Sequence, residues 1–173
     1  MAAFSSIFPG NVEIYMNYWL MKTEPDQYSF EDLTKAKGMT DCWDGIRNYQ
    51  ARNFMRDQFK KGDLVFIYHS RVAEPAIVGT AKVVKEAYPD HTALDPKSKY
   101  FDAKSEEKGE SRWVMVDVKA VSEFSQHVTL ADVKQSKGLE GMALIKRGQR
   151  LSIQPVTKKE WDIILKKGKP KKV

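Results

Sequence analysis

The stretch from Asp63 to Tyr88, DLVFIYHSRVAEPAIVGTAKVVKEAY, gives the clearest indication of the fold. It contains two segments, 63–69 and 76–88, that are rich in valine, isoleucine and aromatic residues, the types that favour β-strands. A third segment of the same kind follows at 112–121. The sequence therefore predicts that a β-sheet dominates the middle of the chain.

Further strands and short helices flank this region. We expect strands at 18–22 and 151–153, and short helices that begin after residues able to cap a helix N-terminus: Ser29, Asn48, Thr129 and Thr157. The helices fall at strand junctions, and the chain lacks a βαβ rhythm. This order predicts an α+β fold built round a curved, mostly antiparallel sheet.

The length of 173 residues suits one domain with an ordinary hydrophobic core. We expect an N-terminal extension at 1–16, the domain at 17–166 and a basic C-terminal tail at 167–173. Five lysines between 166 and 172 account for most of the net charge of +6. The rest of the chain is nearly neutral, so any electrostatic binding must depend on local patches.

Composition excludes several classes of protein. No apolar run reaches the roughly 18 residues of a membrane-spanning helix, so we expect no membrane partner. Cys42 is the only cysteine, which excludes an internal disulfide and a multi-cysteine metal site and favours a cytoplasmic or nuclear location. His91 and His127 have no ligand-spaced partners, and neither a metal nor a cofactor is predicted.

The segment Trp43–Arg52, WDGIRNYQAR, combines residues that suit a flat, polar ligand. Indole and phenol rings stack on bases, guanidiniums bind phosphate or the edge of guanine, and an asparagine offers both a donor and an acceptor to a base edge. The alternative interpretation is a buried tryptophan ahead of a solvated helix start. A long polar segment at 89–111 is expected to be mobile and to act as a lid or a ligand-facing loop.

In order and spacing, several segments together resemble an EVE domain of the thymocyte nuclear protein type, over about residues 17–166. These segments are YWLMKTEP at 18–25, WDGIRNYQAR at 43–52, GDLV at 62–65, YHS at 68–70, PAIVG at 75–79, RWVMVD at 112–117 and RLSIQPV at 150–156. The resemblance implies a PUA-like pseudobarrel related to YTH and ASCH domains. It also implies a non-catalytic nucleic-acid-binding module, for DNA or RNA, with a pocket suited to a modified base.

The resemblance also suggests roles for individual residues. Trp43 is the expected stacking platform, with Trp113 or Tyr68 as a second wall, although Trp113 is an equally good core residue. His69 and Tyr49 are further pocket candidates. The remaining candidates are polar or cationic: Asn48, Ser70, Ser152 and Gln154 for base edges, and Lys22, Arg47 and Arg52 for phosphate.

Two alternatives remain open. ASCH relatives include amidohydrolases that act on modified nucleosides, and this chain places Lys22 beside Glu24, a pair that can support nucleophilic or general-base chemistry. The common hydrolase and nucleotide-binding motifs are absent from the sequence. The third hypothesis is a protein-interaction module that uses the basic tail. Oligomeric state is not determined by the sequence.

Overall fold

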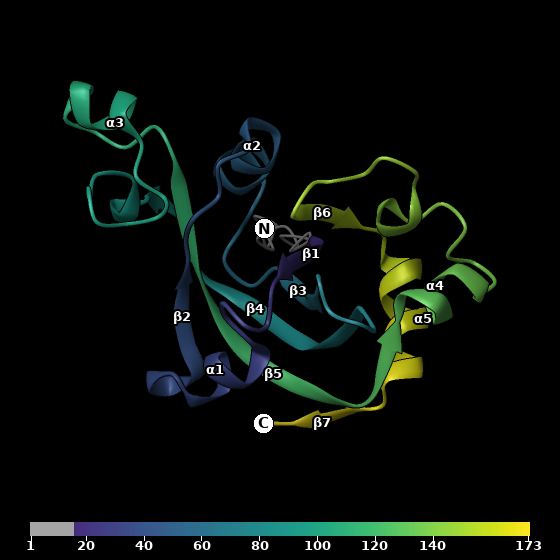
Figure 1. Ribbon diagram of the computed structural model, residues 1–173. Coiled ribbons are helices and arrows are strands. Elements are labelled where there is room, and N and C mark those ends of the chain that lie inside the picture. Colours follow the sequence, from purple (N-terminus) through teal and green to yellow (C-terminus); the bar gives the residue numbers. More distant parts are fainter. Residues whose placement is uncertain (1–15) are drawn as a thin grey trace, which may run out of the picture.

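A computed structural model describes residues 16–173, so the predicted extension at 1–16 lies almost entirely outside the described residues. The described chain forms one curled, unclosed sheet with short helices at its ends and along its edges (Figure 1). The strands are β1 (Tyr18–Thr23), β2 (Thr40–Trp43), β3 (Leu64–His69), β4 (Ala76–Pro89), β5 (Val114–Thr129), β6 (Ile153–Val156) and β7 (Pro170–Lys172). The predicted α+β class and PUA-like pseudobarrel are confirmed.

The sheet has the strand order β2-β5-β4-β3-β1-β6, and β7 also pairs with β5. Only β1 and β3 run parallel among the pairings of the described strands; the others are antiparallel. Long β5 carries two partners on one edge, because β2 pairs with its residues 116–119 and β7 with its residues 122–124. Its two ends lie far apart, near α3 and α4 respectively (Figure 1).

Both faces of the central strands are buried, because their side chains alternate between two hydrophobic cores. In β3, Val65 and Ile67 belong to the first core, whereas Phe66 and Tyr68 belong to the second. The first core lies against α1 (Phe30–Lys35) and α2 (Tyr49–Asp57). The second is closed by α4 (Leu130–Gln135) and α5 (Lys158–Gly168), with Trp161 stacked on Phe66 at 3.9 Å between ring centroids.

The helices begin where the capping residues predicted them. Ser29, Thr129 and Thr157 each form a complete capping box, and the Asn48 side chain accepts hydrogen bonds from two backbone N–H groups at the start of α2. The segment at 89–111 contains a helix of its own, α3 (Ala103–Lys108), capped by Asp102. Three single 3₁₀ turns, at Lys37–Met39, His91–Ala93 and Ala143–Ile145, complete the described elements.

The C-terminal segment is part of the sheet. Residues 170–172 of the expected basic tail form β7, in which Lys172 pairs with Ser122 and Pro170 with Phe124. Just before this strand, Gly168 lies so close to Phe124 that an added Cβ would be 2.2 Å from its ring. The exposed lysines of this segment are therefore carried on an edge strand, where charged side chains also discourage pairing with other chains.

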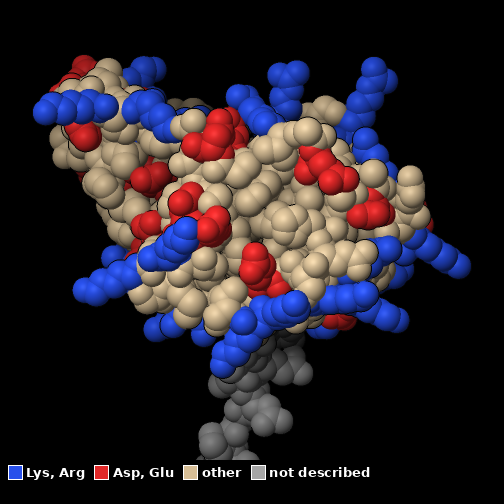
Figure 2. Space-filling view, turned by 60° about the horizontal axis from the view of Figure 1, so that its bottom comes forward, with Lys and Arg blue, Asp and Glu red and all other residues tan. Residues whose placement is uncertain are grey.

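Positive and negative side chains are interspersed on the face that Figure 2 shows. On the face drawn in Figure 2, lysine and arginine side chains stand along the outline and acidic side chains lie among them. None of the helices among residues 16–173 has the length and apolar character needed to cross a membrane. Binding of an anionic ligand must consequently depend on a local arrangement of cations.

Candidate functional site

A cavity of about 710 Å³ lies between the end of β1, the end of β2 and the loops that follow them. Lys22 of β1 and Ser152, just before β6, lie on one side, while β2 and the loop into α2 supply Trp43–Ile46. The 89–111 segment contributes Lys99 and Tyr100. The other lining residues are Thr23, Glu24, Gln27, Tyr28, Asp41, Cys42, Ser70, Arg71 and Arg150.

Three aromatic side chains give this cavity its flat walls. Trp43 is 8% exposed and meets the ring of Tyr28 edge to face, with 6.2 Å between the centroids. The Tyr28 hydroxyl donates a hydrogen bond of 2.7 Å to Asp41, which fixes the ring, and burial together with this bond raises the pKa of the phenol. Tyr100 lies against Gly45, which has a φ of +74° and, as a glycine, no side chain that would collide with the tyrosine ring.

Half-buried carboxylates share this space with half-buried Lys22 and with exposed cations at the rim. Burial and the neighbouring Asp90 raise the pKa of Asp44, and burial raises the pKa of the Cys42 thiol to about 11, so this thiol is protonated at neutral pH. Burial lowers the pKa of Lys22. At the rim, Arg71 forms an ion pair of 3.2 Å with Glu24. The cavity thus offers hydrogen-bond acceptors at its wall and positive charge at its edge.

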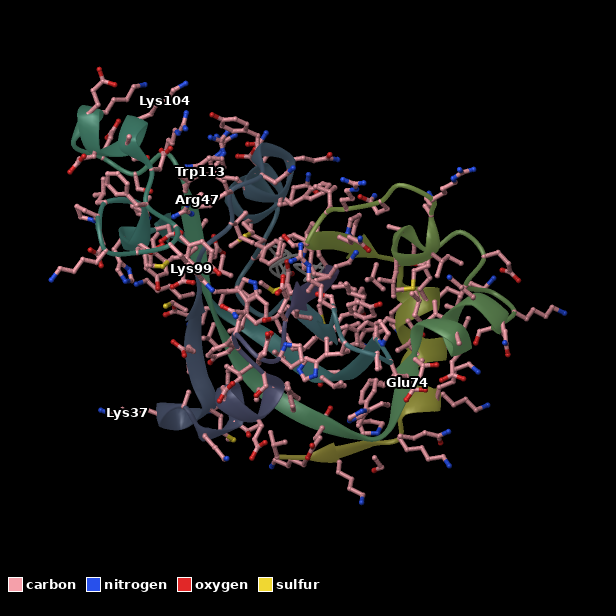
Figure 3. The ribbon with its side chains drawn as sticks, viewed as in Figure 1. Lys37, Arg47, Glu74, Lys99, Lys104 and Trp113 are labelled. Carbon is pink, nitrogen blue, oxygen red and sulfur yellow. The ribbon has the colours of Figure 1, made fainter. Side chains whose placement is uncertain are left out.

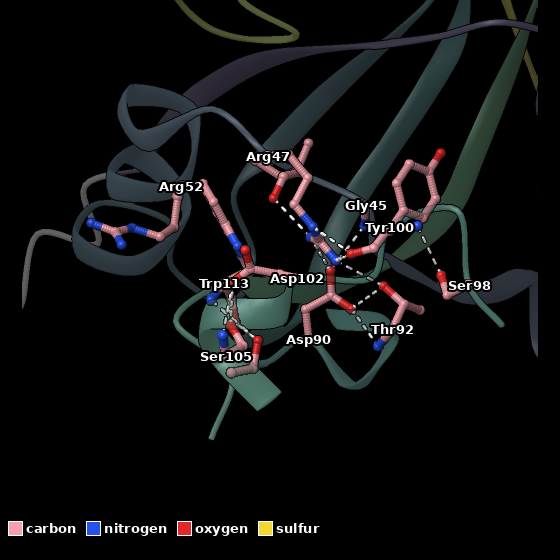
Figure 4. A network of polar contacts seen from close by, with 12 residues as sticks. Gly45, Arg47, Arg52, Asp90, Thr92, Ser98, Tyr100, Asp102, Ser105 and Trp113 are labelled. Atoms are coloured by element: carbon pink, nitrogen blue, oxygen red, sulfur yellow. Dashed lines mark hydrogen bonds and ion pairs between the residues drawn. The ribbon is translucent and has the colours of Figure 1, made fainter. Parts of the chain in front are cut away.

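Arg47 holds the 89–111 segment against this cavity instead of lining it. Its guanidinium bonds the Asp90 carboxylate at 2.8 Å and the backbone oxygen of Tyr100, and Gly45 N–H donates to the same carboxylate (Figure 4). Asp90 is fully buried; burial opposes its ionisation, but bonds from Thr92 and Arg47 keep its pKa below the ordinary value. The ion pair between half-buried Arg47 and buried Asp90 therefore positions both the Gly45 turn and the Tyr100 ring.

The structure brings four of the predicted site residues together in the cavity: Lys22, Trp43, Ser70 and Ser152. A second group lies together outside it, at the start of α2, where Tyr49 stacks on Trp113 with Arg52 beside both rings. Figure 3 shows Trp113, Arg47 and Lys99 in succession along the side of the molecule that carries α3.

The other predicted residues make contacts within the fold. Asn48 caps α2, and Tyr68 is buried in the second core. His69 Nε2 accepts a 3.1 Å hydrogen bond from the backbone N–H of Phe30 at the start of α1. Buried Gln154 donates to the backbone oxygen of Leu151 at 3.0 Å and, unlike Ser152, does not line the cavity.

Sequence reasoning missed several lining residues. Asp44 and Gly45 lie inside the 43–52 segment, and Arg150 is the first residue of the 150–156 segment. Both segments carry the family resemblance, but these three residues were given no role in the site. Lys99 and Tyr100 come from the segment that was expected to face a ligand. Tyr28 had no sequence signal, because its position depends on how the β1–α1 turn folds back over β2.

Comparisons with known proteins agree with this architecture. Residues 17–167 match the EVE domain family. Mouse thymocyte nuclear protein 1 is 44% identical over 166 residues, which cover 86% of this chain and 72% of that protein. A crystal structure of a Pseudomonas syringae protein, 48% identical, superimposes with a TM-score of 0.80 over 86% of this chain and 97% of its own.

One similar structure contains a ligand. Human THYN1 in complex with DNA that contains 5-methylcytosine is 43% identical, with a TM-score of 0.80 over 87% of this chain and 96% of that one. Motifs, sheet topology and these relatives lead to the same assignment. The chain belongs to the EVE domain family.

Proposed function

We propose that this protein binds DNA without catalysis and reads a modified base, 5-methylcytosine, in the aromatic-walled cavity. The observation that carries this proposal is the cavity itself, in which Trp43, Tyr28 and Tyr100 meet half-buried carboxylates and rim cations. It is supported by the complex of human THYN1, a 43% identical relative, with 5-methylcytosine-containing DNA.

The chemistry of the walls matches a base taken out of a duplex. An extruded base loses its stacking neighbours, and aromatic side chains restore about 1–3 kcal/mol per base. Cytosine presents an amino group, for which Asp44 and Asp41 are suitable acceptors. The added methyl group is apolar and gains from contact with the ring edges of Tyr28 and Trp43.

The rim suits the nucleic-acid backbone. Lys22, Lys99 and Arg150 stand round the opening together with Arg71, which is already paired with Glu24. Cations placed in this way contact phosphates and hold the strand in register without reading its sequence. Recognition of the base and affinity for the backbone are therefore assigned to different residues of one site.

Fluorescence anisotropy with DNA containing either cytosine or 5-methylcytosine tests the proposal. We expect tighter binding of methylated DNA, and loss of this preference when Ser152→Phe fills the half-buried side of the cavity. Gln135→Phe, at an exposed position at the end of α4, adds the same ring elsewhere and is expected to leave binding unchanged. An unaltered preference for methylated DNA in Ser152→Phe would contradict the proposal.

One observation favours a second candidate function. Lys22 lines the cavity with a lowered pKa, as a nucleophilic or basic lysine requires, and Glu24 lines the same cavity. The amidohydrolase hypothesis predicts that acylated nucleosides are hydrolysed and that Lys22→Met abolishes turnover. Absence of hydrolysis by the purified wild-type protein would exclude it, and a reader without catalysis remains the function that we propose.

A further inference from the structure

A second aromatic surface lies outside the cavity. Tyr49, the first residue of α2, is 51% exposed, and its ring stacks on buried Trp113 with 4.9 Å between centroids and 28° between planes. The guanidinium carbon of Arg52 lies 4.8 Å from the Tyr49 centroid, and that of Arg112 lies 5.7 Å from it. We call Tyr49, Arg52, Arg112 and Trp113 the α2 platform.

Hydrogen bonds from Arg112 hold the side chains of the platform in place. Arg112 binds Asp102 through two hydrogen bonds of 2.8 Å and donates a third, also 2.8 Å, to the Tyr49 hydroxyl. This pairing holds the pKa of the Asp102 carboxyl well below its ordinary value. A stacking ring that is fixed before binding loses little side-chain entropy when a ligand arrives.

Charge on the platform is unevenly compensated. Arg112 is neutralised by Asp102, whereas the hydrogen bonds of Arg52 go to the Asn53 side chain and the backbone oxygen of Arg112. Within residues 16–173, Arg52 forms no ion pair with a carboxylate. A half-exposed aromatic ring beside an uncompensated guanidinium is suited to an unstacked base and its phosphate.

The platform is continuous with the cavity. The guanidinium carbon of Arg47 lies 5.5 Å from the Trp113 centroid and 5.6 Å from the centroid of Tyr100, which lines the cavity (Figures 3 and 4). The row Tyr100, Arg47, Trp113, Tyr49 therefore leads from the cavity wall to solvent. This row offers a path to a strand whose base occupies the cavity.

We propose that the α2 platform is a second nucleotide-binding site, which stacks an unpaired base flanking the base held in the cavity. This inference rests on the proposed reading of a modified base and adds a requirement for an unstacked neighbour. Since every base has an aromatic face, the site contributes affinity without sequence preference.

The test uses single-stranded DNA of about seven nucleotides, within the usual range of single-strand sites. Each strand carries one 5-methylcytosine and the fluorescent base 2-aminopurine at one flanking position. We expect quenching at one of these positions by the wild-type protein and by Tyr49→Phe, which retains the ring. In Tyr49→Ala we expect no quenching and an affinity about 5- to 150-fold weaker, which corresponds to one lost stacking contact.

Tyr18→Ala is the matched control, because Tyr18 packs against Trp161 of the second core, with 5.1 Å between ring centroids and 39° between the planes. It is expected to leave both quenching and affinity unchanged. A 5-methylcytosine mononucleotide, too short to reach the platform, should bind wild type and Tyr49→Ala equally.

Absence of quenching at every flanking position, or equal weakening of the mononucleotide in Tyr49→Ala, would overturn the inference. Ser152→Phe separates this outcome from failure of the cavity proposal. If the strand binds through the cavity but not the platform, only Ser152→Phe weakens it; if it binds through the platform alone, only Tyr49→Ala does.

Discussion

Gly45 is the residue on which the geometry of the cavity wall depends. Its φ is +74°, and an added Cβ would lie 2.5 Å from the Tyr100 ring, so both backbone conformation and space require glycine. We expect Gly45→Ala to lower the free energy of unfolding by about 1–3 kcal/mol more than the backbone effect alone, since Tyr100 must move. It should also weaken binding of methylated DNA.

Gly109→Ala provides the matched comparison for this prediction. Gly109 has a nearly identical φ of +72° but no atom within 4 Å of an added Cβ. Urea unfolding of both variants isolates the cost of displacing Tyr100. If the two substitutions lower the free energy of unfolding equally, the displacement of Tyr100 has no cost in stability.

His69 makes stability depend on pH. Burial, and then the nearby His127, lowers the pKa of His69 below its ordinary value of 6.5, and its Nε2 accepts the Phe30 N–H only when unprotonated. Because the folded pKa is below the unfolded one, this contribution is complete above pH 6.5 and is lost as pH falls through the folded value. Urea midpoints measured from pH 7.5 down to about pH 5 should fall more steeply in wild type than in His69→Gln.

For the candidate binding residues, the sequence predicted the type of side chain better than its place in the folded protein. Trp43, Lys22, Ser70 and Ser152 line the cavity, whereas Tyr49 and Trp113 lie together outside it. A sequence shows that residues belong to one motif, but Trp43 ends a strand and Tyr49 begins a helix, so they point to different places. The turn between them contains Gly45, whose φ is positive.

Among elements, β7 shows how a charged tail becomes part of a sheet. We expect deletion of residues 170–173 to lower the free energy of unfolding by about 1–3 kcal/mol, because the backbone pairing with β5 is lost. The double variant Lys171→Gln and Lys172→Gln removes the same charges but keeps the strand, and its urea midpoint should be unchanged. If the deletion leaves the midpoint unchanged as well, β7 does not contribute to stability.

The elements that sequence predicted are those with strong local signals. Capping residues located the helix starts, and the valine- and isoleucine-rich segments located β3 and β4. The short strands β2 and β7 were not predicted, because TDCW and PKK have no alternating apolar pattern and depend on β5 for their pairing. β5 itself extends beyond 121, where its polar residues include Glu123, Ser125 and Gln126.

At the scale of the whole molecule, the position of a charge matters more than the net charge of +6. Positive side chains from separate parts of the chain meet at the cavity rim, whereas Lys166 and Lys167 lie at the end of α5, where they line a smaller hollow with His127.

Each phosphate contact on a single strand changes the slope of log K against log salt by about 0.7. Replacing Lys99 and Arg150 by Gln should therefore reduce the slope for methylated single-stranded DNA by about 1.4. Replacing Lys166 and Lys167 by Gln changes the net charge equally and should leave the slope unaltered. Equal slopes in the two double variants would mean that the whole molecule attracts DNA through its net charge, and that the rim of the cavity has no special part in binding.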